Sequence, residues 1–329
     1  MPGAEERVLR RRIGSVQNTK KITRAMELIA ATRVVRAQMR ANEARPYAET
    51  LTSVIEDLAA GGAEVDHPLL REPESVDKVG FVVITSDRGL AGPYNANVIR
   101  AAERELMASR AGGVDYSLVL IGKKAGDYFR FRHYRIDALY TGMSDKPAYD
   151  DAREVADTVT EHFESGAVDK IVLVYTEFVS LGTQRVRVRR FLPLETTTTI
   201  AEAGAPERRA AFEFEPSPPA VLGALLPRYV EARLYAALLD SAASEHASRQ
   251  RAMKAATDNA EELILKLTRR MNQARQDAIT TEIMEIIGGA AALAEHKGSE
   301  EDLLLDELDW TEPFPALGKR TFFAHNPER

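Results

Sequence analysis

The stretch SDRGLAGPYNANV, residues 86–98, offers the most direct chemistry in the sequence. It follows a short apolar run and precedes a helix-like segment, and a glycine-containing loop in that place can cradle a phosphate with its backbone N–H groups. The loop carries Gly89-x-x-Gly92, however, without the G-x-G-x-x-G order and without a Gly-Lys-Ser/Thr ending. The spacing therefore favours a tight strand-to-helix turn, with nucleotide binding as the alternative.

No other pattern assembles a catalytic or metal-binding group. The six histidines lack H-E-x-x-H or other ligand spacing, and no G-x-S-x-G nucleophile elbow occurs. The adjacent Asp150 and Asp151 are explained by a solvated helix start. The absence of cysteine excludes a disulfide, a thiolate nucleophile and a Cys-ligated metal. We therefore expect no catalytic residue, no cofactor and no metal.

Charge is distributed unevenly along the 329 residues. The formal net charge is −6, yet residues 1–46 hold eleven Lys or Arg against four Glu, and residues 295–312 hold eight acids against one Lys. The basic run suits a solvated helix face, or a protein partner with matching carboxylates. A nucleic-acid grip would need a broader basic face and more aromatic residues than residues 1–46 provide.

Composition sets limits on the class of protein. An apolar content of 44% and a charged content of 29% are ordinary for a soluble globular protein. No apolar run approaches the roughly 18 residues that span a bilayer, so we expect membrane contact only through a partner. The first residues lack the apolar core of a secretory signal.

Two long segments have helical periodicity. In the first, about Glu5–Leu58, an apolar row is interrupted by polar residues at 20–27, where Ile22, Met26 and Ile29 form a second row. In the second, fourteen of seventeen positions spaced by three and four are apolar, which is typical of a coiled-coil seam. The polar exceptions, at 246–257, predict a weak seam midway. The first row is Leu9, Ile13, Val16, Ala30, Val34, Ala37, Ala41 and Ala44; the long one is Leu222, Leu225, Tyr229, Ala232, Ala236, Leu239, Ala243, His246, Gln250, Met253, Thr257, Ala260, Ile264, Leu267, Met271, Ala274 and Ala278.

Punctuating residues bound these helices. Pro227 predicts a kink or a late helix start, and the pairs Gly61-Gly62 and Gly288-Gly289 predict helix ends. Neither helix can bury its seam alone, so we expect the two to pack together, antiparallel, with a globular domain inserted between them.

The region between the helices has an α/β pattern. Short apolar runs predict buried parallel strands, an alternating run predicts an antiparallel edge strand, and the segments between them suit crossover helices. The fold class is thus α/β plus coiled coil, with a Rossmann-like domain inserted in a long antiparallel pair of helices. The predicted strands are 79–85, 116–122, 170–178 and the edge strand 184–194; the helices are 96–109 and 147–163; the divisions are 1–62 (helix), 76–214 (α/β domain), 219–293 (helix) and 294–329 (acidic extension).

Four stretches carry a family resemblance. VQNTKKITRAMELIAATR, SDRGLAGPYNANV, AMKAATDNAEELI and NQARQDAITTEIMEIIGGAAAL resemble, in order and spacing, the gamma subunit of F-type ATP synthase. The resemblance covers roughly residues 3–293. It implies a non-catalytic rotor shaft that couples proton-driven rotation of a membrane ring to ATP synthesis on the beta subunits. Its implied partners are three alpha and three beta subunits, epsilon and the c-subunit ring, without nucleic acid, at the cytoplasmic face of the bacterial plasma membrane.

The resemblance also implies contact residues. Lys20, Lys21, Arg24 and Met26, with Arg275 and Gln276, match positions that meet acidic loops of the beta subunits. The apolar turns near the C-terminal end match a low-friction bearing at the top of the ring. The bearing residues are Ile283, Met284, Ile286, Ile287 and Leu293.

Residues 294–329 depart from the family pattern, because the family commonly ends near the Gly-Ala-Ala-Ala-Leu stretch. We expect a flexible tail. The alternative is a regulatory segment, in which Leu303–Leu305, Leu308 and Trp310 form an amphipathic patch that docks on the head and hinders reverse rotation.

Overall fold

The computed structural model describes residues 3–60, 67–194, 215 and 217–296. The chain divides into two units. One is Ser15–Ile264; the other combines Met1–Gly14 with Leu265–Arg329, of which residues 3–14 and 265–296 are described. None of the helices in these ranges combines the length and the hydropathy that a membrane span requires.

Two long helices begin and end the described chain. Helix α1 spans Gly3–Ala60 and α6 spans Pro218–His296. Both are rich in Ala, Leu, Arg and Glu, which have high helix propensity. The predicted late start at Pro227 is wrong, because α6 already begins at Pro218. The buried neighbours Leu226 and Val230 hold this segment against the core, so the helix persists although proline lacks one backbone donor.

The predicted helix end at Gly288-Gly289 is also wrong, because α6 continues through both glycines to His296. Each glycine costs about 1 kcal/mol relative to alanine in a helix. The alanines and the leucine of the following stretch, Ala290–Leu293, are strong helix formers, and they outweigh this cost. By contrast, α1 ends at Ala60, directly before the pair Gly61-Gly62, as the sequence predicts.

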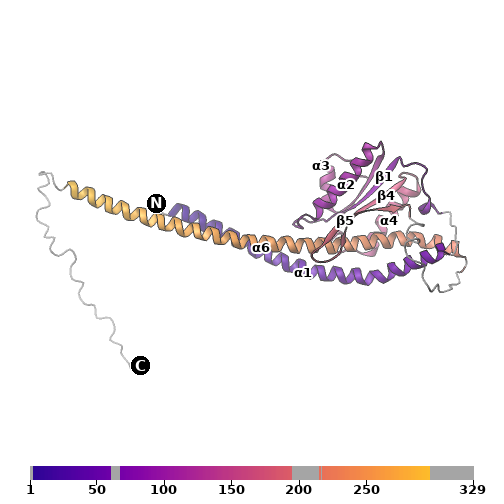
Figure 1. The fold of residues 1–329 in the computed structure, drawn as a ribbon, viewed down its shortest axis with the longest axis horizontal. Helices are drawn as coiled ribbons and strands as arrows, with labels where there is room; N and C mark the ends of the chain where they lie inside the picture. Colours follow the sequence, from indigo (N-terminus) through magenta and orange to yellow (C-terminus); the bar gives the residue numbers. More distant parts are fainter. Residues whose placement is uncertain (1–2, 61–66, 195–214, 216, 297–329) are drawn as a thin grey trace, which may run out of the picture. The chain divides into compact units, whose positions relative to one another are not determined.

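Within the unit Ser15–Ile264, α1 and α6 run antiparallel (Figure 1). Lys20, early in α1, forms an ion pair of 2.9 Å with Glu261, late in this part of α6. Leu58, near the end of α1, shares an apolar cluster with Leu222 and Leu226, near the start of α6. The predicted antiparallel pairing is confirmed.

The predicted seam of α6 faces its neighbours almost throughout. Every member of the long row is buried or half-buried except Ala236. On α1, however, the second row does not take over: Ile22 is 61% exposed and Ile29 is 52% exposed. Thr23 is buried instead, and its hydroxyl lies 2.8 Å from that of Thr257. The two polar side chains satisfy each other across the seam, so the original row continues and the second-row prediction is wrong.

The inserted domain contains one five-stranded sheet of order β3-β2-β1-β4-β5. The first four strands are parallel in their pairings and β5 pairs antiparallel at the edge, as predicted. The sequence did not predict the short elements α3 (Lys123–Phe131) and β3 (Ala138–Tyr140), because each has too few residues to show a periodic pattern. The elements are η1 (Pro68–Leu70), β1 (Lys78–Ile84), α2 (Tyr94–Ala111), β2 (Asp115–Ile121), α3 (Lys123–Phe131), β3 (Ala138–Tyr140), α4 (Tyr149–Glu164), β4 (Lys170–Phe178) and β5 (Gln184–Leu192).

The sheet is covered on both faces, and α6 supplies part of one cover. Val98 of α2 and Phe129 of α3 pack with residues of one face, whereas Val155 of α4 and Val230 of α6 pack with the other (Figure 1). Each fully buried side chain of this kind contributes about 1.5–3 kcal/mol. Helix α6 therefore belongs both to the layer that covers one face of the sheet and to the antiparallel pair of long helices.

Candidate functional site

The motif that suggested a phosphate loop forms the turn between β1 and α2. Ser86 donates its backbone N–H to Asn95 Oδ1 at 2.9 Å and its hydroxyl to the Arg88 carbonyl at 2.6 Å. Gly92 has φ of +55°, which favours glycine, and its position for a Cβ lies 3.5 Å from the Ala252 Cβ of α6. The predicted strand-to-helix turn is confirmed, and it packs directly on α6.

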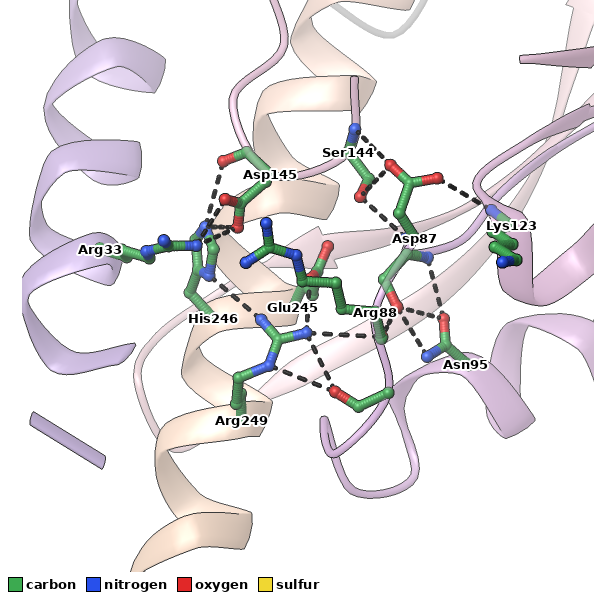
Figure 2. Close-up of polar contacts among 12 residues, drawn as sticks. Arg33, Asp87, Arg88, Asn95, Lys123, Ser144, Asp145, Glu245, His246 and Arg249 are labelled. Atoms are coloured by element: carbon green, nitrogen blue, oxygen red, sulfur yellow. Dashed lines mark hydrogen bonds and ion pairs between the residues drawn. The ribbon is translucent and has the colours of Figure 1, made fainter. Parts of the chain in front are cut away.

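Asp87 ties this turn to two other segments at the same edge of the sheet. Its carboxylate accepts hydrogen bonds from the Gly142 N–H at 2.9 Å, the Ser144 hydroxyl at 3.0 Å and the Lys123 N–H at 3.0 Å (Figure 2). Its own N–H donates to the Ser144 hydroxyl at 3.0 Å. The N–H groups of Ser86 and Asp87 are thus engaged within the protein and are not available to a phosphate. This arrangement counts against nucleotide binding at the turn.

Arg249 of α6 joins the helix to the turn. Its guanidinium donates to the Gly89 carbonyl from Nε at 3.4 Å and from Nη2 at 3.3 Å, and to Glu245 Oε1 at 2.7 Å. Arg249 is 7% exposed and Glu245 is 1% exposed. Burial raises the pKa of Glu245, and the adjacent Arg249 opposes that shift. The ion pair is a buried anchor between α6 and the turn. Removing either partner would leave the other buried without a compensating charge.

Asp145, in the loop between β3 and α4, connects both long helices. Arg33 of α1 donates to its carboxylate oxygens at 2.6 and 2.5 Å, and His246 Nε2 of α6 lies 3.2 Å from its backbone carbonyl (Figure 2). Burial lowers the pKa of His246, which favours the neutral imidazole. A proton on Nε2 then donates to Asp145 and leaves Nδ1 to accept from Arg249 at 3.4 Å.

We call this group the joint network: Arg33, Asp87, Gly89, Asp145, Glu245, His246 and Arg249. On α6 it comprises Glu245, His246 and Arg249, at the start of the polar interval 246–257 that the sequence suggested as a weak part of the seam. There α6 exchanges apolar contacts for polar contacts to the inserted domain. Sequence spacing could not reveal this, because Asp145 and His246 are 101 positions apart.

Within the joint network, Asp145, Glu245 and His246 place one donor atom each within 4.8 Å of one another. Such a donor set can bind a divalent metal. Here Arg33 and Arg249 contact the carboxylates of Asp145 and Glu245, and their charges compensate them without an ion. The cluster is chemically better suited to an internal salt-bridge network.

The predicted basic contact residues of α1 lie on one groove. Lys20, Lys21 and Arg24 line a cavity of about 750 Å³ with Leu28 and Ile264. Lys20 is paired with Glu261, Arg24 lies 3.0 Å from Glu27, Lys21 is exposed and Met26 is half-buried. The groove combines cationic side chains with an apolar floor.

The remaining predicted residues belong to the other unit, on α6. Arg275 and Gln276 are exposed. The residues predicted to form the bearing expose between 51% and 73% of their surface, which is unusual for large apolar side chains in sequence neighbours. They are Ile283, Met284, Ile286, Ile287 and Leu293.

Fold and joint network together define a protein in which an α/β domain is inserted into, and fixed to, an antiparallel pair of long helices. The chain belongs to the ATP synthase gamma chain family: the ATP synthase family model matches residues 5–293. The ATP synthase gamma chain of Frankia casuarinae is 54% identical over 293 residues, covering 88% of this chain and 97% of that protein.

Solved structures share the fold. A chain of the Tetrahymena thermophila mitochondrial ATP synthase central stalk and c-ring has a TM-score of 0.55 at 22% identity, covering 71% of this chain and 99% of that chain. A chain of the Euglena gracilis mitochondrial ATP synthase, with OSCP, F1 and c-ring, has a TM-score of 0.62 at 17% identity, covering 94% and 99%. At such identities these structures support the architecture alone.

Proposed function

We propose that this chain is the central-stalk rotor of a proton-translocating ATP synthase and couples rotation of the c-subunit ring to ATP synthesis. Family membership and the central-stalk architecture of the solved relatives support this role. Its partners are then three alpha and three beta subunits, epsilon and the c-subunit ring. The chain is non-catalytic in this proposal, and peripheral at the cytoplasmic face of the bacterial plasma membrane.

Coupling requires that rotation change the affinity of each catalytic site. One proton crossing 100 mV supplies about 2.3 kcal/mol, so several crossings must be summed for each ATP. An asymmetric shaft presents a different face to each beta subunit, and each face favours a different conformation of that subunit. Such differential contact is what shifts a conformational equilibrium.

The joint network is the observation that carries this proposal. A shaft must pass torque from the part that is driven to the part that makes contact. Asp145 of the domain binds Arg33 of α1 and His246 of α6, while Arg249 of α6 binds the Gly89 carbonyl of the domain. The inserted domain is thereby fixed to both helices by directional bonds in addition to apolar packing.

We propose that the basic groove contacts carboxylates of the beta subunits. Lys20, Lys21 and Arg24 line this groove, Met26 is half-buried nearby in the sequence, and Arg275 and Gln276 are exposed farther along α6. Lys20 is already paired with Glu261 and Arg24 with Glu27, so the exposed Lys21 is the cation most available to an external partner. Exposed pairs are worth less than about 1 kcal/mol each, and single substitutions are therefore expected to be nearly silent.

Co-purification of the full chain with alpha and beta subunits tests the assignment, with one copy per three alpha–beta pairs expected. The triple charge reversal K20E/K21E/R24E should then weaken assembly or proton-driven synthesis. A matched triple reversal of exposed arginines on α2 and α3, R100E/R104E/R130E, should leave coupling through the groove intact. Normal synthesis by K20E/K21E/R24E would contradict the contact role.

The bearing is a separate proposal. Exposed apolar side chains suit a sliding contact, because no directional hydrogen bond has to break as the shaft turns. Replacing Ile283, Met284, Ile286 and Ile287 by Asp should slow ATP hydrolysis of the assembled complex, whereas replacement by Leu should preserve it. An unchanged rate in the Asp variant would remove the bearing role.

The regulatory hypothesis concerns the extension 294–329, whose patch Leu303–Leu305, Leu308 and Trp310 lies outside the described residues. We propose that the functional divisions are 1–62, 76–214, 219–293 and this extension. Truncation after Leu293 tests the regulatory hypothesis. Faster ATP hydrolysis by the assembled complex would support an inhibitory role of the extension, and an unchanged rate would exclude one.

A further inference from the structure

A cavity of about 330 Å³ lies between α1, α4 and α6 in the unit Ser15–Ile264. The space is left open because small side chains line it on both long helices. They are Ala41, Ala44 and Ala48 of α1 and Ala232 and Ala236 of α6. Protein interiors are normally close-packed, and a space of this size holds on the order of ten water molecules. The cavity is large enough for a small organic molecule.

Aromatic side chains supply much of the remaining wall. Tyr47 of α1, Tyr149 of α4 and Tyr235 of α6 line the cavity. The rings of Tyr149 and Tyr235 meet edge to face, with centroids 5.5 Å apart, and the Tyr149 hydroxyl donates to Glu231 at 2.7 Å. Several aromatic rings around one space are the arrangement that binds alkylated ammonium groups.

One carboxylate completes the wall. Asp240 of α6 lines the cavity and makes no hydrogen bond or ion pair with any described residue. The charges of Glu177 of β4 and Arg189 of β5 influence the ionisation of Asp240. These two residues form an ion pair with each other at 3.6 Å. Arg45 of α1 is exposed but also lines the cavity, and its charge favours the ionised form of Asp240. Arg45 and Asp240 thus share the cavity wall without forming an ion pair, and Arg45 is the cation with which a ligand would compete.

We propose that this cavity binds a small organic ammonium ion, with the alkyl groups among the tyrosines and the charge beside Asp240. Neither the joint network nor the proposed contact residues take part in it. The same chemistry is offered by a free ammonium compound and by the headgroup of a choline lipid, and the test below separates the two sources.

Binding is measured by titrating choline into the purified full chain at pH 7.5, with 3,3-dimethylbutan-1-ol as the neutral compound of the same shape. Choline should bind about tenfold more tightly, since the cation gains from both the rings and the carboxylate. Equal affinities would overturn the proposal, and so would the absence of binding by either compound.

Variants locate the site. D240N should weaken choline binding about tenfold while leaving the neutral compound unaffected, and Tyr47→Ala should weaken it severalfold. Arg45→Ala should strengthen it, because the competing cation is removed. The matched control is D258N, which changes an exposed Asp of the same helix and should bind as the unchanged chain does. Equal binding by D240N and the unchanged chain would refute the site.

The pH dependence provides a further check. Burial, followed by the charge of Glu177, raises the pKa of Asp240 to about 6. Choline affinity should thus fall as the pH is lowered through 6, and D240N should show no such fall. Sedimentation with phosphatidylcholine vesicles that depends on Asp240 would assign the ammonium to a lipid headgroup; binding of free choline without vesicle binding would assign it to a free ion.

Discussion

Helix α6 contains two regions with opposite environments. Every residue from Ser241 to Arg249 is buried, whereas every residue from Thr281 to Ala294 is exposed. The first region is rich in polar residues and the second in apolar residues, which is the reverse of what solvent alone would select. In the first region, neighbouring elements bond Ser244, His246 and Arg249, while the Ser241 hydroxyl and Glu245 Oε2 are buried without a hydrogen-bond partner among the described residues. In the second, no described residue covers the apolar groups, which is the expected property of a surface made for a partner.

The largest effect should come from breaking the buried region at Arg249. Arg249→Ala leaves Glu245 buried without its partner and frees the Gly89 carbonyl, so the free energy of unfolding should fall by about 3–5 kcal/mol. Urea denaturation followed by circular dichroism measures this. Lys254→Ala, an exposed substitution on the same helix, should change the value by less than about 0.5 kcal/mol. A similar small change for Arg249→Ala would contradict the anchoring role.

The contribution of Asp240 to the free energy of unfolding should depend on pH. Its folded-state pKa of about 6 exceeds its ordinary value of 3.8, so its contribution to stability is complete below pH 3.8 and is lost as the pH rises through 6. D240N removes the buried charge. It should raise the free energy of unfolding by about 1–2 kcal/mol at pH 7.5, allowing for partial solvent screening, and by nothing at pH 3.5. Urea melts at the two pH values measure this, and an equal effect at both would contradict the burial argument.

The polar pair in the seam should have a smaller effect. Thr23→Val removes the hydroxyl that faces Thr257, and should cost about 1 kcal/mol. The double variant T23V/T257V replaces both partners with apolar groups of similar shape and should recover most of that loss. A double-mutant cycle of urea melts measures the coupling. Strict additivity would show that the two hydroxyls do not interact.

The exposed region should yield the smallest effect on the chain by itself. I286Q/I287Q places polar groups where solvent already reaches, so the free energy of unfolding should change by less than about 0.5 kcal/mol. The same pair of changes at buried apolar positions, L238Q/L239Q, should cost several times more. A large loss in I286Q/I287Q would mean that these side chains are covered within the chain.

Sequence alone predicted the fold where periodicity is long. The seam from Leu222 to Ala278 and the strand at 184–194 repeat their patterns often enough to identify the elements and their buried faces. Short elements such as Lys123–Phe131 could not be predicted, because two turns of helix are too few to show a reliable period. The glycine pair near the end of α6 misled, since neighbouring helix formers outweigh a cost of about 1 kcal/mol per glycine.

The site was harder to predict than the fold. Periodicity marked positions 246–257 as a polar interruption, but could not say what satisfies them. The partners Arg33, Asp145 and Gly89 lie far away in sequence and meet only when the domain is complete. Thr23 illustrates the same limit, because a polar residue in an apolar row appears as a defect until its partner Thr257 is known.

The position of Asp145 has a mechanical consequence. One side chain of α1 and one of α6 reach the same loop residue from different directions. If either helix turned about its own axis, it would carry its side chain away from Asp145, while the other helix would keep its hold. The rotation of each helix about its own axis is therefore coupled to the other helix through Asp145, and rotation of one helix alone must first break a partly buried hydrogen bond.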